Sequence, residues 1–146
     1  MQANFSEILG FANSKSRLRM IMLYQSAASE SGIVVGTGNK VEDFGVGFYT
    51  KYGDGGVDIS PIADCNKTEV WELGKELGIL KEIIDAPPTD GLWDDGRTDE
   101  GQLGLQYNEL EEAMNNPNSE NREKYEKIRK LNLHKMESIP VCKIPN

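Results

Sequence analysis

The pattern of apolar and polar positions predicts a helix in the first part of the chain. Between Phe5 and Ala28, apolar residues recur at helical spacing, as at Leu18, Ile21 and Met22. The segment is consistent with one helix or with two pieces broken near residues 10–14.

Two short runs rich in β-branched residues predict strands. Ile33–Val35 is apolar and lies between Gly32 and Gly36, as a buried strand would, and Val57–Ile62 is a second run with Pro61 at its exit. The expected fold class is therefore α/β, with two parallel strands and flanking helices. In open α/β sheets ligands bind outside the carboxyl ends of the strands, which directs attention to the segment after Gly36.

A second helix is predicted after Asn66, which is a suitable N-cap residue. This helix is expected to bury Val70, Leu73 and Leu77 and to end at Gly78. The remaining pattern predicts, in order, a loop at Pro87–Gly96, a short helix capped by Thr98, a helix over Tyr107–Met114, a charged helix over Ser119–Leu131 and a tail without periodicity from His134 to Asn146.

The segment from Gly36 to Gly56 is rich in glycine and in charge. It contains seven glycines, interleaved with lysines and carboxylates. Glycine lets backbone N–H groups approach an anion, while lysines suit phosphate and carboxylates suit a metal ion. Neither standard phosphate motif is present, because Val41 occupies the third glycine position of GxGxxG and no GxxxxGK(S/T) occurs. The residues alone indicate either an anion-binding loop or a hairpin with Asp54-Gly55 at its turn.

The same segment, GTGNKVEDFGVGFYTKYGDGG, resembles the central part of the ammonia-dependent NAD synthetases, which belong to the N-type ATP pyrophosphatase superfamily. The resemblance begins upstream at NSKSRLRM and continues through DISPIADCNKTEV, APPTDGLWDDGRTDE and the pair His134-Lys135. It implies a Rossmann-like, adenine-nucleotide-hydrolase-like domain, of which residues 1–146 form one partial unit.

Composition and charge exclude several other classes of protein. The chain has 146 residues and a net charge of −8, so binding to nucleic acid through phosphate contacts is not expected. It has no apolar run long enough to span a bilayer and no signal-peptide pattern, so a cytoplasmic protein that does not bind membranes is expected. Cys65 and Cys142 are too few and too far apart to predict a disulfide framework or a zinc site.

The resemblance implies which residues contact ATP and metal. It makes Thr37, Lys67 and Thr89 contacts to ATP and Glu42 a ligand of Mg²⁺. A hard cation prefers oxygen ligands and keeps several waters, so one carboxylate is sufficient as part of its coordination shell. Without the resemblance, Lys67 would be interpreted as a surface lysine and Glu42 as a surface loop carboxylate.

The contacts to the dinucleotide substrate, deamido-NAD, follow in the same way. The resemblance assigns them to Arg17, Lys51, Asp58, His134 and Lys135. It also implies that the first helix builds a homodimer interface. His134 is the only histidine, and a binding role is expected for it rather than proton transfer; no catalytic residue is identified.

One departure limits what the resemblance implies. The SGGxDS-type pyrophosphate loop of the superfamily is absent from the sequence. The resemblance thus implies a ligase chain that amidates deamido-NAD with ammonia, using ATP and Mg²⁺ through an adenylated intermediate, together with a polypeptide that supplies the missing N-terminal half. The alternative is a non-catalytic fragment that binds a nucleotide or pairs with another subunit. A third interpretation, a GMP synthetase-like protein, fits the architecture but does not account for the specific segment GFYTKYGDGG.

Overall fold

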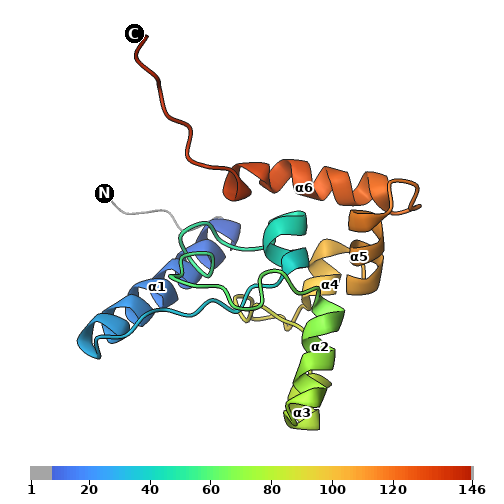
Figure 1. The fold of residues 1–146 in the computed structure, drawn as a ribbon, viewed down its shortest axis with the longest axis horizontal. Helices are drawn as coiled ribbons and strands as arrows, with labels where there is room; N and C mark the ends of the chain where they lie inside the picture. The colour runs from blue at the N-terminus through green and yellow to red at the C-terminus, as the bar shows by residue number, and fades with distance from the viewer. Residues whose placement is uncertain (1–7, 146) are drawn as a thin grey trace.

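The structure, a computed structural model, describes residues 8–145, which are helical or irregular (Figure 1). The elements in order are α1 (Ile8–Ser29), the π-helix η1 (Lys40–Val46), α2 (Lys67–Glu76), α3 (Lys81–Ile84), α4 (Asp99–Leu103), α5 (Tyr107–Asn115) and α6 (Arg122–Met136). Across these residues, no helix combines the length and the apolar character that crossing a bilayer requires.

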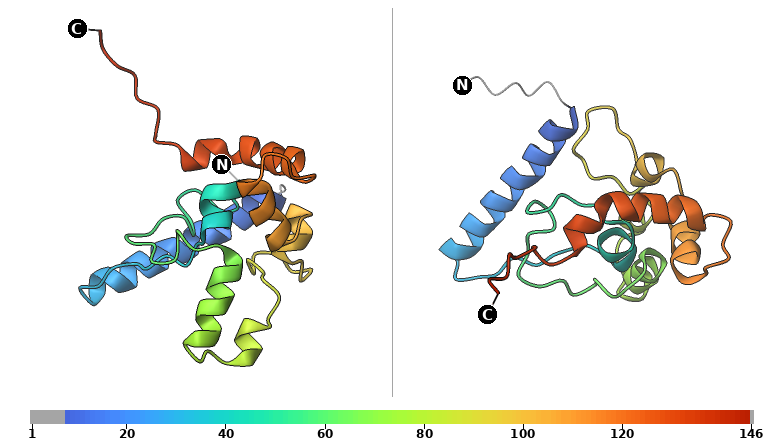
Figure 2. Two further views of the ribbon diagram at one scale, coloured as in Figure 1. Left: turned by 45° about the vertical axis from the view of Figure 1, so that its right-hand side comes forward. Right: turned by 90° about the horizontal axis from the view of Figure 1, so that it is seen from above.

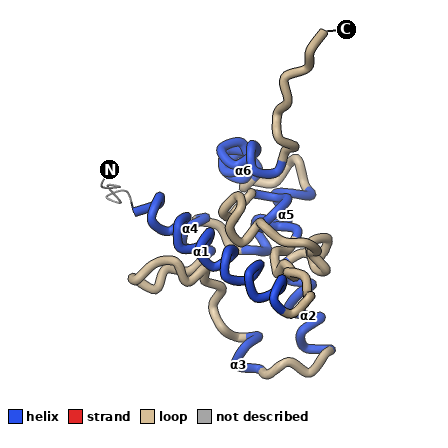
Figure 3. Tube along the Cα trace, turned by 90° about the vertical axis from the view of Figure 1, so that its left-hand side faces the viewer, coloured by secondary structure: helices blue, strands red, loops and turns tan. Residues whose placement is uncertain are grey.

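The two predicted parallel strands are wrong as strands, because residues 8–145 contain none (Figure 3). Their pairing survives as one isolated parallel bridge between Val35 and Ile59. Asp58 N donates to Val34 O at 2.9 Å and Gly36 N donates to Ile59 O at 2.7 Å. A strand needs a ladder of such bonds, and a two-stranded parallel pair flanked by glycine and proline cannot sustain one.

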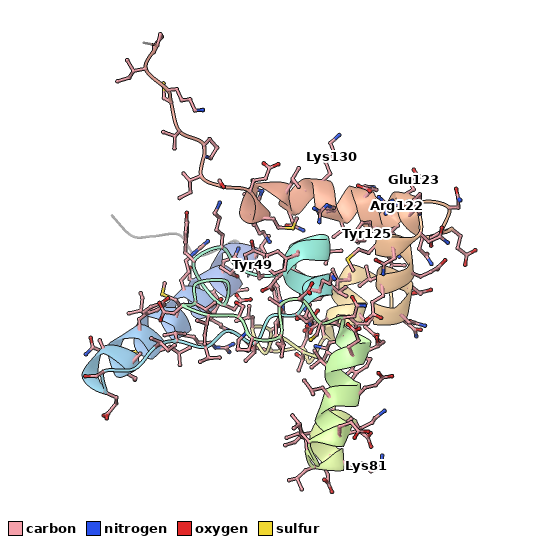
Figure 4. All side chains as sticks on the ribbon, in the orientation of Figure 1. Tyr49, Lys81, Arg122, Glu123, Tyr125 and Lys130 are labelled. Carbon is pink, nitrogen blue, oxygen red and sulfur yellow. The ribbon has the colours of Figure 1, made fainter. Side chains whose placement is uncertain are left out.

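The apolar core lies where α5 and α6 pack on η1. Val41 and Val46 of η1 and Leu110 of α5 are fully buried, and Tyr125 is 3% exposed. Figure 4 shows Tyr125 pointing from α6 towards η1, where its hydroxyl donates to Gly45 O at 3.3 Å. The helices predicted around residues 98, 107 and 119 thus form the main packed unit, and the irregular loop at 87–96 is confirmed.

The sequence sets both ends of η1. Asn39 precedes it, and its Oδ1 accepts hydrogen bonds from Val41 N at 3.0 Å and Glu42 N at 3.1 Å. At the other end Gly47 adopts φ 66°, which favours glycine. The final carbonyls, which a helix leaves unpaired, accept from the α6 side chains Arg129, Asn132 and Lys135. Glu42 is therefore held in the first turn of an element that α6 supports.

Helix α1 is continuous, so the break considered near residues 10–14 does not occur (Figure 2). Phe5, at the start of the predicted helix, lies outside the described residues. The helix joins the glycine-rich segment through Ser16 Oγ, which donates to Asp54 Oδ1 at 2.7 Å, and through Thr50 Oγ1, which donates to Asn13 Oδ1 at 2.7 Å. Its apolar residues Leu18, Ile21 and Met22 are more than half exposed.

Two other predictions about helices need correction. Helix α2 buries none of its residues, and Leu73 and Leu77 are 43% and 69% exposed. Helix α6 begins three residues after the predicted start and continues to Met136, so His134 and Lys135 are helical. Beyond it the chain extends away from the other elements (Figure 1). Periodicity predicted both helices, but it did not show that α2 stays exposed or where α6 ends.

The contact between α1 and the glycine-rich segment leads to a stability prediction. A Cβ atom added at Gly53 would lie 2.2 Å from Ser16 Oγ, whereas one at Gly10 meets nothing within 4 Å. Gly53→Ala should therefore lower the free energy of unfolding by about 1–3 kcal/mol, and Gly10→Ala should raise it by about 0.5–1 kcal/mol. Urea denaturation of both variants checks this, and equal midpoints would contradict the close approach at Gly53.

Candidate functional site

Two of the cavities around the glycine-rich segment adjoin each other, and between them they hold nearly all the predicted site residues. The first, here the Glu42 cavity, has a volume of about 280 Å³ and is lined by Thr37, Glu42, Lys67, Thr89 and Asp99, among others. The second, here the Lys51 cavity, has a volume of about 440 Å³ and is lined by Arg17, Lys51, His134 and Lys135, among others. The structure thus separates the residues predicted for ATP and metal from those predicted for the dinucleotide.

In the Glu42 cavity one carboxylate oxygen of Glu42 accepts two hydrogen bonds. Lys67 Nζ, on the first residue of α2, donates to Glu42 Oε1 at 2.9 Å, and the Tyr107 hydroxyl donates to the same oxygen. The Glu42 and Lys67 side chains are 15% and 17% exposed, so the pair is largely desolvated. Lys67 Nζ also lies 4.8 Å from the centre of the Tyr107 ring. The placement of Lys67 is therefore not that of a free surface lysine.

Asp99 lines this cavity, Tyr107 lies behind it with its hydroxyl bonded to Glu42 and Asp99, and the sequence analysis assigned neither of them to a site. Tyr107 is 1% exposed, and its pKa is raised by burial and then by the charges of Glu42 and Asp99. Asp99 is 7% exposed, and burial followed by the negative charges of Glu42 and Asp90 raises the pKa of its carboxyl to about 6. The sequence signal for Asp99 was only its place after the cap Thr98, so its burial was not predicted.

The cavity suits a metal ion only in part. Within residues 8–145 no cluster of three or more histidine, cysteine, aspartate or glutamate side chains is arranged to hold a metal. Two carboxylates, Glu42 and Asp99, do line the same cavity. This oxygen set fits a hard cation that takes its remaining ligands from water or phosphate.

The Lys51 cavity is shaped by lysines that bond to backbone carbonyls. Lys51 Nζ donates to His134 O at 2.7 Å, and Lys135 Nζ donates to Gly47 O at 2.8 Å and to Tyr49 O at 2.7 Å. Burial lowers the pKa of Lys135. Arg17 Nε donates to Lys51 O at 3.3 Å. These bonds bring together residues that lie far apart in the sequence.

Asp58 does not line either cavity. Its Oδ2 accepts from Val34 N at 2.8 Å and its Oδ1 accepts from the Tyr24 hydroxyl at 3.2 Å. The side chain therefore connects α1 to the parallel bridge. Its predicted contact to the dinucleotide is the one that the geometry does not group with the others.

Asp54 and Asp90 line both cavities and form the wall between them. Asp54 Oδ1 accepts from Ser16 Oγ at 2.7 Å and from Thr50 N at 3.0 Å. Asp90 Oδ2 accepts from the side chains of Trp93 and Gln102, each at 3.1 Å. Both aspartates stood in segments that the sequence analysis singled out, but nothing in the pattern showed that they would line the same cavities.

The irregular loop at 87–96 is held against α1 by basic side chains of that helix. Arg19 donates to Gly91 O at 2.8 Å and to Asp90 O at 3.1 Å, and Lys15 Nζ donates to Leu92 O at 2.9 Å. Thr89 and Asp90 are thereby positioned beside the glycine-rich segment. A rearrangement of α1 would change both cavities at once.

Comparisons with known proteins agree on one family. A family model described as NAD synthase matches residues 2–145. An NH(3)-dependent NAD(+) synthetase of Archaeoglobus fulgidus is 43% identical over 139 residues, which is 91% of this chain and 56% of that protein. A protein of the same description from Carboxydothermus hydrogenoformans is 47% identical over 108 residues, which is 74% of this chain and 44% of that protein. The chain spans about half the length of these curated relatives.

Solved structures give the same picture. The structure of an NMN synthetase from Francisella tularensis superposes with a TM-score of 0.87 at 34% identity, covering 96% of this chain and 59% of that one. An NH3-dependent NAD synthetase from Campylobacter jejuni, in complex with the nitrate ion, gives a TM-score of 0.70 at 22% identity, covering 97% of this chain and 59% of that one. The second likeness concerns the fold alone.

Proposed function

The chain belongs to the NAD synthase family, and from that premise we propose that it forms part of an enzyme that amidates deamido-NAD with ammonia at the expense of ATP. One observation carries the proposal. The residues predicted to bind ATP and metal line one cavity, and most of those predicted to bind the dinucleotide line the adjoining one. Two substrates that react with each other need this arrangement.

The chemistry requires the two substrates to meet at a common wall. The nicotinate carboxylate attacks the α-phosphorus of ATP, pyrophosphate leaves, and ammonia then displaces AMP from the acyl adenylate. In the proposal ATP lies in the Glu42 cavity against Thr37, Lys67 and Thr89. Deamido-NAD lies in the Lys51 cavity, and the reacting groups meet near the wall that contains Asp54 and Asp90.

Each predicted contact has a physical rationale. Lys67 is suited to phosphate as a point charge, and Arg17, Lys51 and Lys135 place positive charge around the larger cavity. Mg²⁺, held by Glu42, would neutralise charge on the phosphates during adenylation. For Asp58 the observed bonds support a role in holding the bridge between residues 34 and 59 beside α1.

The wider setting of the chain is also a proposal. Residues 1–146 act as one partial domain, and turnover requires a polypeptide that carries the SGGxDS loop, which this sequence lacks. A homodimer through α1 is supported by its exposed Leu18, Ile21 and Met22. The cytoplasm is the proposed compartment. The alternative function is that of a non-catalytic fragment that binds a nucleotide or pairs with another subunit.

The Francisella likeness supports a second candidate substrate. That protein is described as an NMN synthetase and superposes with a TM-score of 0.87. The corresponding substrate here would be nicotinate mononucleotide, which lacks the adenylate half of deamido-NAD. Direct competition between the two nucleotides for the chain distinguishes these candidates.

The proposal predicts that the chain binds deamido-NAD more tightly than ATP. Residues predicted to contact the dinucleotide line the Lys51 cavity, whereas the loop that would grip the ATP phosphates is absent from the sequence. Isothermal calorimetry should also show about 10- to 150-fold weaker dinucleotide binding in Lys51→Ala, because a hydrogen bond to a charged group contributes about 1.5–3 kcal/mol.

Lys130→Ala is the matched control, since Lys130 is exposed on α6 and points away from the other elements (Figure 4). It should leave the affinity for deamido-NAD unchanged. Tight binding of ATP with no binding of the dinucleotide would reverse the assignment of the two cavities.

A further inference from the structure

Asp99 is a buried carboxylate that the folded chain does not satisfy. Asp99 is only 7% exposed, and its Oδ1 has no hydrogen-bond partner among the described residues. Burying a polar group without a partner is costly, and such groups in a folded protein call for an explanation. Asp99 also lines the Glu42 cavity. A buried carboxylate oxygen without a partner, in a residue that lines a cavity, points to a ligand.

The neighbours of Asp99 cannot supply the missing partner. Asp99 Oδ2 lies 3.4 Å from the Tyr107 hydroxyl, but that hydroxyl has one hydrogen and lies much closer to Glu42 Oε1. Lys67 Nζ is also directed to Glu42. The other charged group near Asp99, Asp90, is an acid. The cavity therefore contains more carboxylate than the chain itself neutralises.

We propose that Asp99 is a second carboxylate that holds, together with Glu42, the divalent cation of a bound nucleotide. The inference rests on the proposed function, because it takes the cation to arrive with ATP. Mg²⁺ binds through one or two carboxylates plus substrate phosphates and keeps several waters. Glu42 and Asp99, two carboxylates with the Tyr107 hydroxyl close to both, match this number of protein ligands. Within residues 8–145 there is no cluster of three or more ligand side chains, which a site built from protein alone would need.

A role in binding metal predicts opposite effects with and without the cation. In Asp99→Asn, the gain in ATP affinity caused by Mn²⁺ should fall about 10- to 100-fold, as for other residues that support a metal. In EDTA the same variant should bind ATP at least as well as the parent, because a carboxylate that repelled the phosphates has gone. A purely structural residue would lower the affinity under both conditions.

Isothermal calorimetry of ATP in Mn²⁺ and in EDTA measures both effects, with Glu42→Gln as the positive comparison. Asp64→Asn is the control for charge, because the Asp64 side chain is 99% exposed and pairs with Lys40 away from Asp99. It should behave as the parent. In EDTA, urea denaturation should show Asp99→Asn no less stable than the parent, since it replaces an unpaired buried charge by a neutral group of the same shape.

The outcomes separate this inference from the proposed function. If Glu42→Gln loses the Mn²⁺ effect and Asp99→Asn keeps it, the inference is overturned and the proposed function stands. An equal loss of ATP affinity by Asp99→Asn in Mn²⁺ and in EDTA also overturns it, because a structural residue or a direct hydrogen bond to the nucleotide would act in both conditions. If the parent chain binds neither ATP nor deamido-NAD, both proposals fail.

Discussion

Purified by itself, the 146-residue chain should form no detectable NAD from deamido-NAD, ATP, Mg²⁺ and ammonia. The backbone N–H and hydroxyl donors of the SGGxDS loop, which would hold the phosphates in the transition state, are not in this sequence. Loss of a single such donor costs about 3–4 kcal/mol in other enzymes, which is about a hundred- to a thousandfold in rate. Several are missing here, so the residual rate should be negligible.

Adding a polypeptide that carries the SGGxDS half should restore NAD formation. Residues 8–145 pair in parallel only at the Val35–Ile59 bridge, and the side chains of Ile33, Val35 and Ile59 beside it are exposed. In the proposal, the added polypeptide covers this apolar region. The measurement is NAD formation by protein purified free of host enzyme, with and without that polypeptide. Robust NAD formation by the chain alone would contradict the need for this polypeptide, and it would mean that the chain contains another phosphate site.

Replacing Lys67 by methionine should destabilise the chain by about 3 kcal/mol or more, because removal of one partner from a buried ion pair leaves an uncompensated charge. Glu42 would keep only the Tyr107 hydroxyl as donor, and the cavity that it lines with Asp99 would lose the positive charge of Lys67. The side chains of Glu42 and Lys67 are at most 17% exposed, so water would not fully replace the lost partner. Lys67 therefore stabilises the cavity even before a nucleotide binds.

A double-mutant cycle isolates this effect. The variant Lys67→Met/Glu42→Gln removes both charges and should recover most of the stability that Lys67→Met loses, because a buried ion pair replaced by neutral groups is often close to neutral in stability. Lys81→Met is the control, since its partner Asp85 is 55% exposed and surface pairs contribute about 0–1 kcal/mol. If the double variant is as unstable as Lys67→Met, the loss comes from packing of the lysine stem rather than from charge.

Much of the local structure could be predicted from the sequence, because local signals decide it. Asn66 and Thr98 are cap residues, and helices begin directly after them. Gly78, with φ 70°, follows the end of α2 as expected. The chemical character of the site was also local, since a segment with seven glycines and interleaved charges needs no distant partner to be recognised as a place for ligands.

The sequence by itself therefore determined the family, the residues to suspect and the helices other than η1 and α3, which it did not predict. Only the tertiary structure decided how those residues group. Glu42 and Lys67 belong to the beginnings of two different helices, and they form a pair because η1 and α2 both pack towards α5. Asp99 became a candidate ligand only when folding buried it beside Tyr107. Burial and like-charge proximity are properties of residues far apart in the chain, so no periodicity or spacing could reveal them. The same reason explains the lost strands: apolar runs predict a sheet, but a sheet exists only where enough neighbouring backbone completes its hydrogen bonds.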